Sequence, residues 1–139
     1  MAALATALAL AACGASTGPT GGARLADFFT REVFGFPTLL TSATTDEREI
    51  LVTGLLIAPG TSYLVTGELE ERPDTLVVVI RGARRSESRA VAVQNYYGAT
   101  IDGLARRSYR IRVLHVTQKV NQPEVWDTTL VYDRAVLVR

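Results

Sequence analysis

From Glu49 to the C-terminus, short apolar runs rich in β-branched residues alternate with turn residues. Thr75 to Ile80 is apolar after its first residue, which predicts a central strand buried on both faces. Pro59-Gly60 supplies a strong turn between two of the runs. Strands without intervening helices predict an all-β sandwich or barrel rather than a parallel sheet. The six runs are residues 50–58, 63–69, 75–80, 89–97, 108–117 and 128–138.

One stretch narrows this prediction. Leu104 precedes Tyr109, and Tyr109 opens an alternating run that continues with Ile111 and Val113. This pattern resembles the tyrosine corner of immunoglobulin and fibronectin type III domains, in which a tyrosine hydroxyl near the penultimate strand bonds to an upstream backbone group. The resemblance implies an immunoglobulin-like antiparallel β-sandwich of six to seven strands, with Leu104 and Tyr109 in structural roles.

The N-terminus has a different character. Residues 4–12 carry no charge and end in small side chains, as the apolar core of a secretory signal does. The run is too short to span a bilayer, which takes roughly 20 apolar residues. Leu10, Ala11, Ala12 and Cys13 match the lipobox at each position, so the chain resembles bacterial lipoprotein precursors. The resemblance implies cleavage before Cys13 and lipidation of its sulfur.

The lipobox resemblance also implies a location. A lipid on Cys13 would hold the protein on a membrane of the cell envelope, and Gly14 at the next position favours the outer membrane. Cys13 is the only cysteine, so the chain can form no internal disulfide. The alternatives are an ordinary secretory signal or a buried helix, with Cys13 incidental. The first charged side chain is Arg24, so the chain departs from the positively charged start that signals normally have.

The expected domain organisation follows from these features. It comprises a signal peptide at 1–12, a lipidated cysteine and Gly-rich flexible tether at 13–23, a lead-in segment at 24–48 and a β-sandwich at 49–139.

The lead-in segment is predicted to contain a short helix from Arg24 to Phe36. Its side chains on one face recur at intervals of three and four residues, and Gly35 and Pro37 would end it. Such a helix would close one end of the core, or lie on a membrane or a partner. The spaced residues are Leu25, Phe28, Phe29, Glu32, Val33 and Phe36, and a polar connection is predicted for residues 38–47.

Few residues could carry chemistry. His115, the only histidine, shares a predicted strand face with Tyr109, which is typical of a core or rim residue. One histidine and one cysteine cannot supply the three or four ligands of a zinc site. Acids from Glu68 to Asp74 flank a turn without the pattern of a calcium loop. With no nucleophile elbow and no phosphate-binding glycine loop, the sequence predicts no cofactor, no metal and no enzymatic activity.

Arginine is the unevenly distributed residue. Arg84 and Arg85 lie in one predicted hairpin, and Arg106 and Arg107 lie in another. If the two hairpins meet, the guanidinium groups could hold carboxylates or phosphates; solvated strand faces are the alternative. Trp126 ends a long connection and could anchor a partner or cover the edge of the core.

These features lead to an expected function. The net charge of +1 supplies no global field for nucleic acid, so no nucleic-acid partner is expected. We expect a lipid-anchored envelope lipoprotein acting as a non-catalytic binding or scaffold module for an envelope protein or polysaccharide. The alternatives are an accessory subunit of a secretion or transport assembly, and a small envelope hydrolase. The sequence does not set the oligomeric state.

Overall fold

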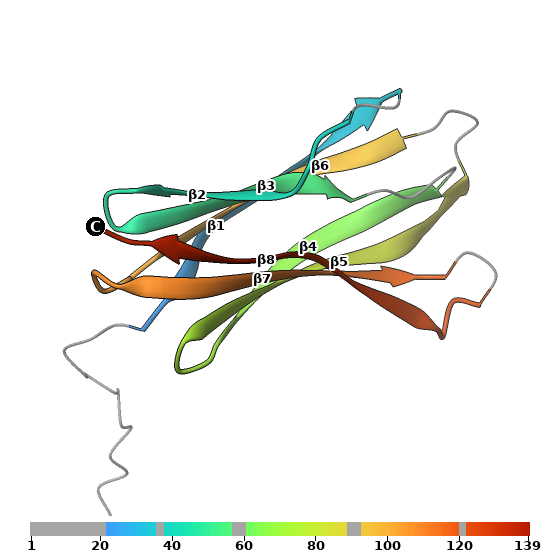
Figure 1. Cartoon of the computed structure of the whole chain (residues 1–139). Coiled ribbons are helices and arrows are strands. Elements are labelled where there is room, and N and C mark those ends of the chain that lie inside the picture. Colours follow the sequence, from blue (N-terminus) through green and yellow to red (C-terminus); the bar gives the residue numbers. More distant parts are fainter. Residues whose placement is uncertain (1–21, 36–37, 57–60, 89–92, 120–121) are drawn as a thin grey trace, which may run out of the picture.

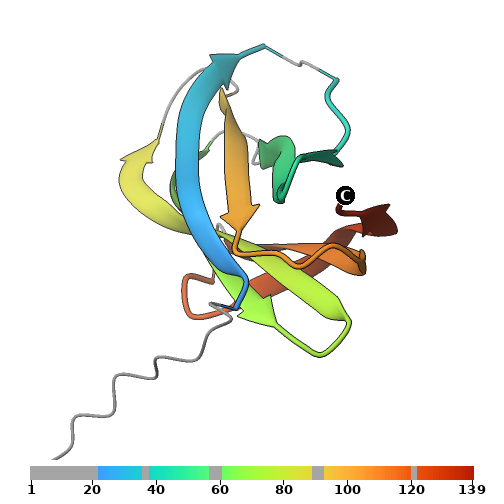
Figure 2. The ribbon, with the colours of Figure 1, turned by 90° about the vertical axis from the view of Figure 1, so that its left-hand side faces the viewer.

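The computed structural model describes residues 22–35, 38–56, 61–88, 93–119 and 122–139. These residues form strands and their connections, with no helix and hence none that could cross a membrane. Two four-stranded sheets pack face to face, sheet A in the order β1-β6-β3-β2 and sheet B in the order β4-β5-β7-β8 (Figure 1, Figure 2). The all-β sandwich prediction is confirmed. The strands are β1 (Arg24–Phe34), β2 (Ser42–Asp46), β3 (Glu49–Leu56), β4 (Thr61–Glu71), β5 (Thr75–Ser88), β6 (Val93–Asp102), β7 (Ser108–Gln118) and β8 (Trp126–Leu137).

The core lies between the sheets, where alternate residues of the inner strands point inward. Strand β5 is buried on both faces, as its apolar run predicts. Val78 and Ile80 face the core, whereas Val77 and Val79 form a second cluster with Val116 on the outer face of sheet B. The fully buried side chains of the core include Ile50, Val52, Leu76, Val78, Ile80, Tyr97, Ile101, Ile111 and Val113.

Neighbouring strands are antiparallel except for β5 and β7, which run parallel. After β5 the chain leaves sheet B, crosses sheet A as β6 and returns to sheet B as β7 beside β5. The chain reverses direction on entering β6 and again on entering β7, so β7 runs in the same direction as β5. The expectation of a wholly antiparallel sandwich is wrong at this pair, because a strand of the opposite sheet replaces the crossover helix that usually joins parallel neighbours.

The helix predicted to begin at Arg24 is wrong. Residues Arg24–Phe34 form β1, which pairs with β6 along its length. Phe28 and Phe29, which helical spacing placed on one face, point to opposite faces: Phe28 packs against Gly67 of β4, and Phe29 covers Gly98 of β6. Pairing with β6 overrides a weak local preference, as tertiary context often does. The sandwich therefore includes β1 and begins well before Glu49.

Two other segments also differ from their predictions. Strand β2 lies within the predicted polar connection. Strand β5 continues to Ser88, beyond the predicted run at 75–80 and through the predicted hairpin of Arg84 and Arg85. In both cases a neighbouring strand, β3 or β4, supplies the backbone partners. Polar side chains are compatible with a strand whose outer face meets solvent.

The strand directions give the sandwich two distinct ends (Figure 1). Arg24 pairs with Asp102, and β8 finishes at Leu137 beside the start of β7, so the beginning of β1 and the C-terminus share one end. We call it the entry end. Trp126 pairs with Gln118 at the opposite end, which we call the distal end.

Candidate functional site

Tyr109 forms a corner at the entry end. Its side chain is 3% exposed, and its hydroxyl accepts a hydrogen bond of 2.9 Å from the backbone N–H of Ala105. Leu104 is buried beside it, and the Arg107 guanidinium lies 4.5 Å from the centre of the Tyr109 ring. The contact that the sequence predicts for Tyr109 is thus present. A closer likeness to immunoglobulin domains stays a prediction based on this corner.

The two arginine pairs do not form one site. Arg84 and Arg85 lie towards the distal end of β5, whereas Arg106 and Arg107 precede β7 at the entry end. Because β5 and β7 run side by side in the same direction, about twelve residues, or roughly 40 Å, separate the pairs. A single anion site built from both hairpins is therefore excluded.

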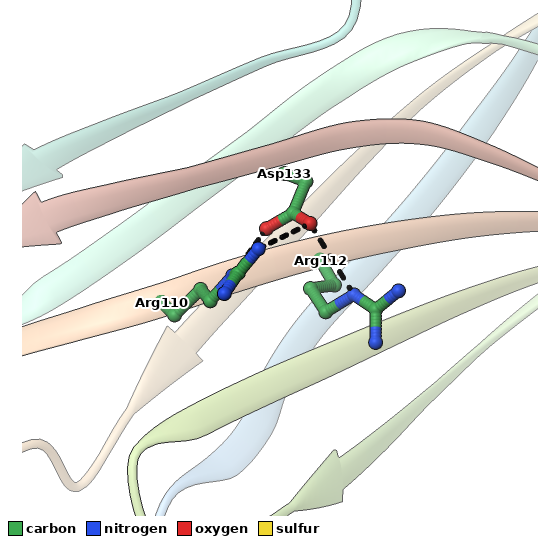
Figure 3. A network of polar contacts seen from close by, with 3 residues as sticks. All are labelled: Arg110, Arg112 and Asp133. Atoms are coloured by element: carbon green, nitrogen blue, oxygen red, sulfur yellow. Dashed lines mark hydrogen bonds and ion pairs between the residues drawn. The ribbon is translucent and has the colours of Figure 1, made fainter.

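Arginines on the outer face of sheet B contact a carboxylate of the neighbouring strand (Figure 3). Arg110 donates two hydrogen bonds to Asp133, of 2.6 and 2.8 Å, and Nε of Arg112 lies 3.6 Å from the same carboxylate. The hydrogen bond from Arg110 is the main cause of a lowered pKa at Asp133. These residues match the solvated strand face that the sequence left as an alternative.

Trp126 is the first residue of β8, and its side chain is 38% exposed. The guanidinium of Arg81 lies 5.4 Å from the ring centre and also pairs with Glu68 at 3.7 Å. Lys119, at the end of β7, pairs with Asp127 at 3.5 Å. We call Arg81, Arg84, Lys119 and Trp126 the distal surface.

Gln118 braces the distal surface. Its side-chain oxygen accepts a hydrogen bond of 2.9 Å from the backbone N–H of Arg84, and its side-chain nitrogen donates to the carbonyl of Pro123. Its own carbonyl accepts a hydrogen bond of 3.2 Å from the hydroxyl of Tyr63. These bonds tie the start of the β7–β8 connection to β4 and β5. Sequence reasoning missed Gln118, since only strand pairing brings its partners together.

His115 lies between the sheets. Its Nε2 atom is 2.8 Å from the hydroxyl of Tyr97, and the two rings meet edge to face. Burial lowers the pKa of His115 to about 4 and raises the pKa of Tyr97 to about 12, so both groups are neutral at pH 7. The pair is an uncharged link between β7 and β6. Within the described part of the chain, no group of three His, Cys, Asp or Glu side chains is arranged to hold a metal.

A hollow of about 690 Å³ opens at the entry end. Arg24 donates two hydrogen bonds to Asp102, of 2.6 and 2.9 Å, and Arg48 donates two to the carbonyl of Leu104, of 3.2 and 3.0 Å. Both arginines of the hollow are therefore engaged by acceptors of the chain itself.

The predicted lipidation site, Cys13, lies outside the described residues, as do the predicted signal peptide and most of the tether. No family model, no curated protein and no solved structure matches this chain. The described residues form a two-sheet β-sandwich.

Proposed function

We propose that this chain is a lipid-anchored lipoprotein of the cell envelope, in which the sandwich is a non-catalytic binding or scaffold module. The observation that supports this proposal is the position of the two ends of the sandwich relative to the N-terminal segment. Strand β1, to which the lipobox and the tether lead, starts at the entry end, and the distal surface lies at the other end. A lipid on Cys13 would hold the entry end near the membrane and leave the distal surface facing away from it.

Chain dimensions support this orientation. A Gly-rich linker of ten residues, the number from Gly14 to Ala23, would span about 17 Å on average. Strand β8 has 12 residues, or about 40 Å at 3.3 Å per residue. The distal surface would therefore lie several tens of ångströms above the lipid headgroups, within reach of partners in the envelope.

The chemistry of the distal surface suits a partner that carries carboxylates or phosphates. Arg81 lies on the ring of Trp126, and Arg84 and Lys119 add two further cationic side chains at this end of the sandwich. Among the described residues Arg81 pairs with Glu68, and Lys119 pairs with Asp127. A half-exposed tryptophan with a guanidinium on its face is a frequent anchor at interfaces. The braces at Gln118 hold the surface in place, which limits the entropy lost when a partner binds.

The state of His115 also supports a non-catalytic role. A general base needs an accessible imidazole with a pKa near the working pH. The pKa of His115 is lowered to about 4 by burial, and its Nε2 atom is bonded to Tyr97. This histidine contributes to packing between the sheets.

Two experiments test the proposal. Cys13→Ser should move the protein from the membrane fraction to the soluble fraction, because acyl chains supply the binding energy. Unchanged membrane association, with no lipid on Cys13 by mass spectrometry, would overturn the anchor.

The second experiment is crosslinking with mass spectrometry on intact cells. Trp126→Ala should weaken capture of the crosslinked partner by about tenfold, or 1.4 kcal/mol. Phe29→Ala is the matched control, since Phe29 is 43% exposed on the opposite sheet and should leave capture unchanged. Equal loss in both variants would contradict a role for the distal surface. A single protein captured in fixed ratio would favour the accessory-subunit alternative.

A further inference from the structure

Strand β8 is a free edge of the sandwich. Among the residues that the structure describes, it pairs with β7 on one side and with no strand on the other, over the 12 residues Trp126–Leu137. On the same side of the sandwich, sheet A ends with the five-residue strand β2. A groove of about 580 Å³ lies between β2 and β8, and its lining includes Ala43, Val136 and Leu137. Figure 2 shows the end of β8 at the margin of the molecule. An edge of this kind presents unpaired N–H and C=O groups to any further strand.

The opposite side of the sandwich is less suited to a further strand. There β1 and β4 form the edges of the two sheets, and Phe28 of β1 packs against Gly67 of β4. Strand β4 also carries Glu68, Glu70 and Glu71, so pairing of two β4 strands would gather like charges.

Strand β8, by contrast, is complementary to itself. In one antiparallel register between two copies, Asp127 of each chain opposes Arg134 of the other. The same register sets Leu130 opposite Val131 at the centre. It also sets Thr129 opposite Tyr132, and pairs of these types stabilise antiparallel strands.

A β-bulge makes this register possible. Val113 pairs with Tyr132 and Leu114 with Leu130, so Val131 is an extra residue in β8. In a regular strand, residues an odd number of positions apart point to opposite faces, and a bulge shifts this alternation by one. The seven-residue spacing from Asp127 to Arg134 spans the bulge.

The strand partners confirm that both charged residues point to the core side of sheet B. Arg134 opposes Ile111, which is fully buried in the core. Thr129, two residues after Asp127, opposes His115, which bonds to Tyr97 of sheet A. Asp127 and Arg134 therefore share a face, as opposed residues of a ladder must.

Both charges are accessible to a second molecule. The side chain of Asp127 is 57% exposed and pairs with Lys119 at 3.5 Å. Arg134 is exposed, and it makes no hydrogen bond or ion pair with the residues that the structure describes.

We propose that two copies of this chain associate through their β8 edges, antiparallel about a two-fold axis near Leu130 and Val131. The two B sheets then form one continuous sheet, with an ion pair between Asp127 and Arg134 at each end of the contact. This dimer does not depend on the lipid anchor. Because the paired strands are antiparallel, it places the two entry ends at opposite ends of the contact, so it competes with the upright orientation proposed for the anchored chain.

Charged residues and bulges on edge strands can also serve to prevent pairing. The two roles give opposite responses to substitution. If the charges attract a second copy, neutralising one of them weakens association; if they guard the edge, neutralising one strengthens it.

The test is sedimentation of the full chain carrying Cys13→Ser, over a range of concentrations. Asp127→Arg and Arg134→Asp should each weaken the dimer by about tenfold or more, because like charges then oppose each other at both ends. The double reversal should restore it. Circular dichroism should show each variant folded. A wild-type chain that is monomeric throughout, a dimer indifferent to both reversals, or stronger association of Asp127→Asn would each overturn the proposal.

A second measurement fixes the register. In the Cys13→Ser background, a mixture of the Trp126→Cys and Ala135→Cys chains should form a mixed disulfide, since these positions oppose each other. A mixture of Thr128→Cys and Ala135→Cys, displaced by two residues, is the matched control. Equal yields from the two mixtures would overturn the proposed register.

Discussion

Acidification from pH 7 to pH 5 should destabilise this protein through one residue. His115 is the only histidine in the chain, and it is held between the sheets with Nε2 at 2.8 Å from the hydroxyl of Tyr97. Burial lowers its pKa to about 4. Protonation would place a charge among apolar side chains that cannot solvate it.

The sign and size of the effect follow from linkage. The pKa of His115 is about 4 in the folded chain, below the value of roughly 6.5 for an unfolded chain. The unfolded state therefore takes up the proton first. The stabilising contribution is fully present above about pH 6.5 and is lost as the pH falls towards 4. The free energy of unfolding should drop by about 2 kcal/mol between pH 7 and pH 5, and by at most about 3 kcal/mol from this residue.

Urea denaturation at several pH values measures this loss directly. His115→Gln is the control, because its free energy of unfolding should change little between pH 7 and pH 5. The pKa values of Asp102 and Asp133 are lowered mainly by hydrogen bonds from Arg24 and Arg110, so those carboxylates lose their contribution only at lower pH. Parallel pH profiles for wild type and variant, or an imidazole that titrates near 6.5 by NMR, would refute the reasoning.

Three substitutions test other parts of the structure. Tyr109→Phe removes the acceptor of the Ala105 N–H and should lower the free energy of unfolding by about 1–3 kcal/mol; an unchanged urea midpoint would contradict the corner. Gly54→Ala would place a Cβ against the hydroxyl of Tyr97 inside the sandwich, and should destabilise by about 1–3 kcal/mol in the same assay. Trp126→Ala should change the free energy of unfolding by less than about 1 kcal/mol, because the ring is 38% exposed; a loss of several kcal/mol would make Trp126 a core residue.

Local sequence patterns were sufficient to predict the buried stretches of β5 and β7. The apolar run from Thr75 to Ile80 and the alternation from Tyr109 to Val113 correctly predict β5 and β7, because burial on one or both faces leaves a direct trace in side-chain order. The contact between Tyr109 and an upstream backbone group could also be anticipated, since the corner is built from residues four apart.

Strand β1 could not be predicted from the local sequence pattern. The apolar residues of β1 fit helical spacing as well as strand spacing. The strand exists because its residues pair with β6, 59 to 78 positions later in the chain. The parallel alignment of β5 and β7, which separates Arg84 from Arg107, likewise depends on which sheet β6 joins.

Some features of the candidate sites are likewise visible in the sequence, and others depend on the tertiary structure. The lipobox at Cys13 is a linear signal that the sequence carries by itself, and Trp126 stands out there as the only tryptophan. The contact of the Arg81 guanidinium with its ring, the hydrogen bonds of Gln118 and the shared strand face of Asp127 and Arg134 depend on strand register. Side-chain periodicity is a local property and survives in the sequence, whereas register and sheet order are set by contacts between distant segments, which only the folded chain decides.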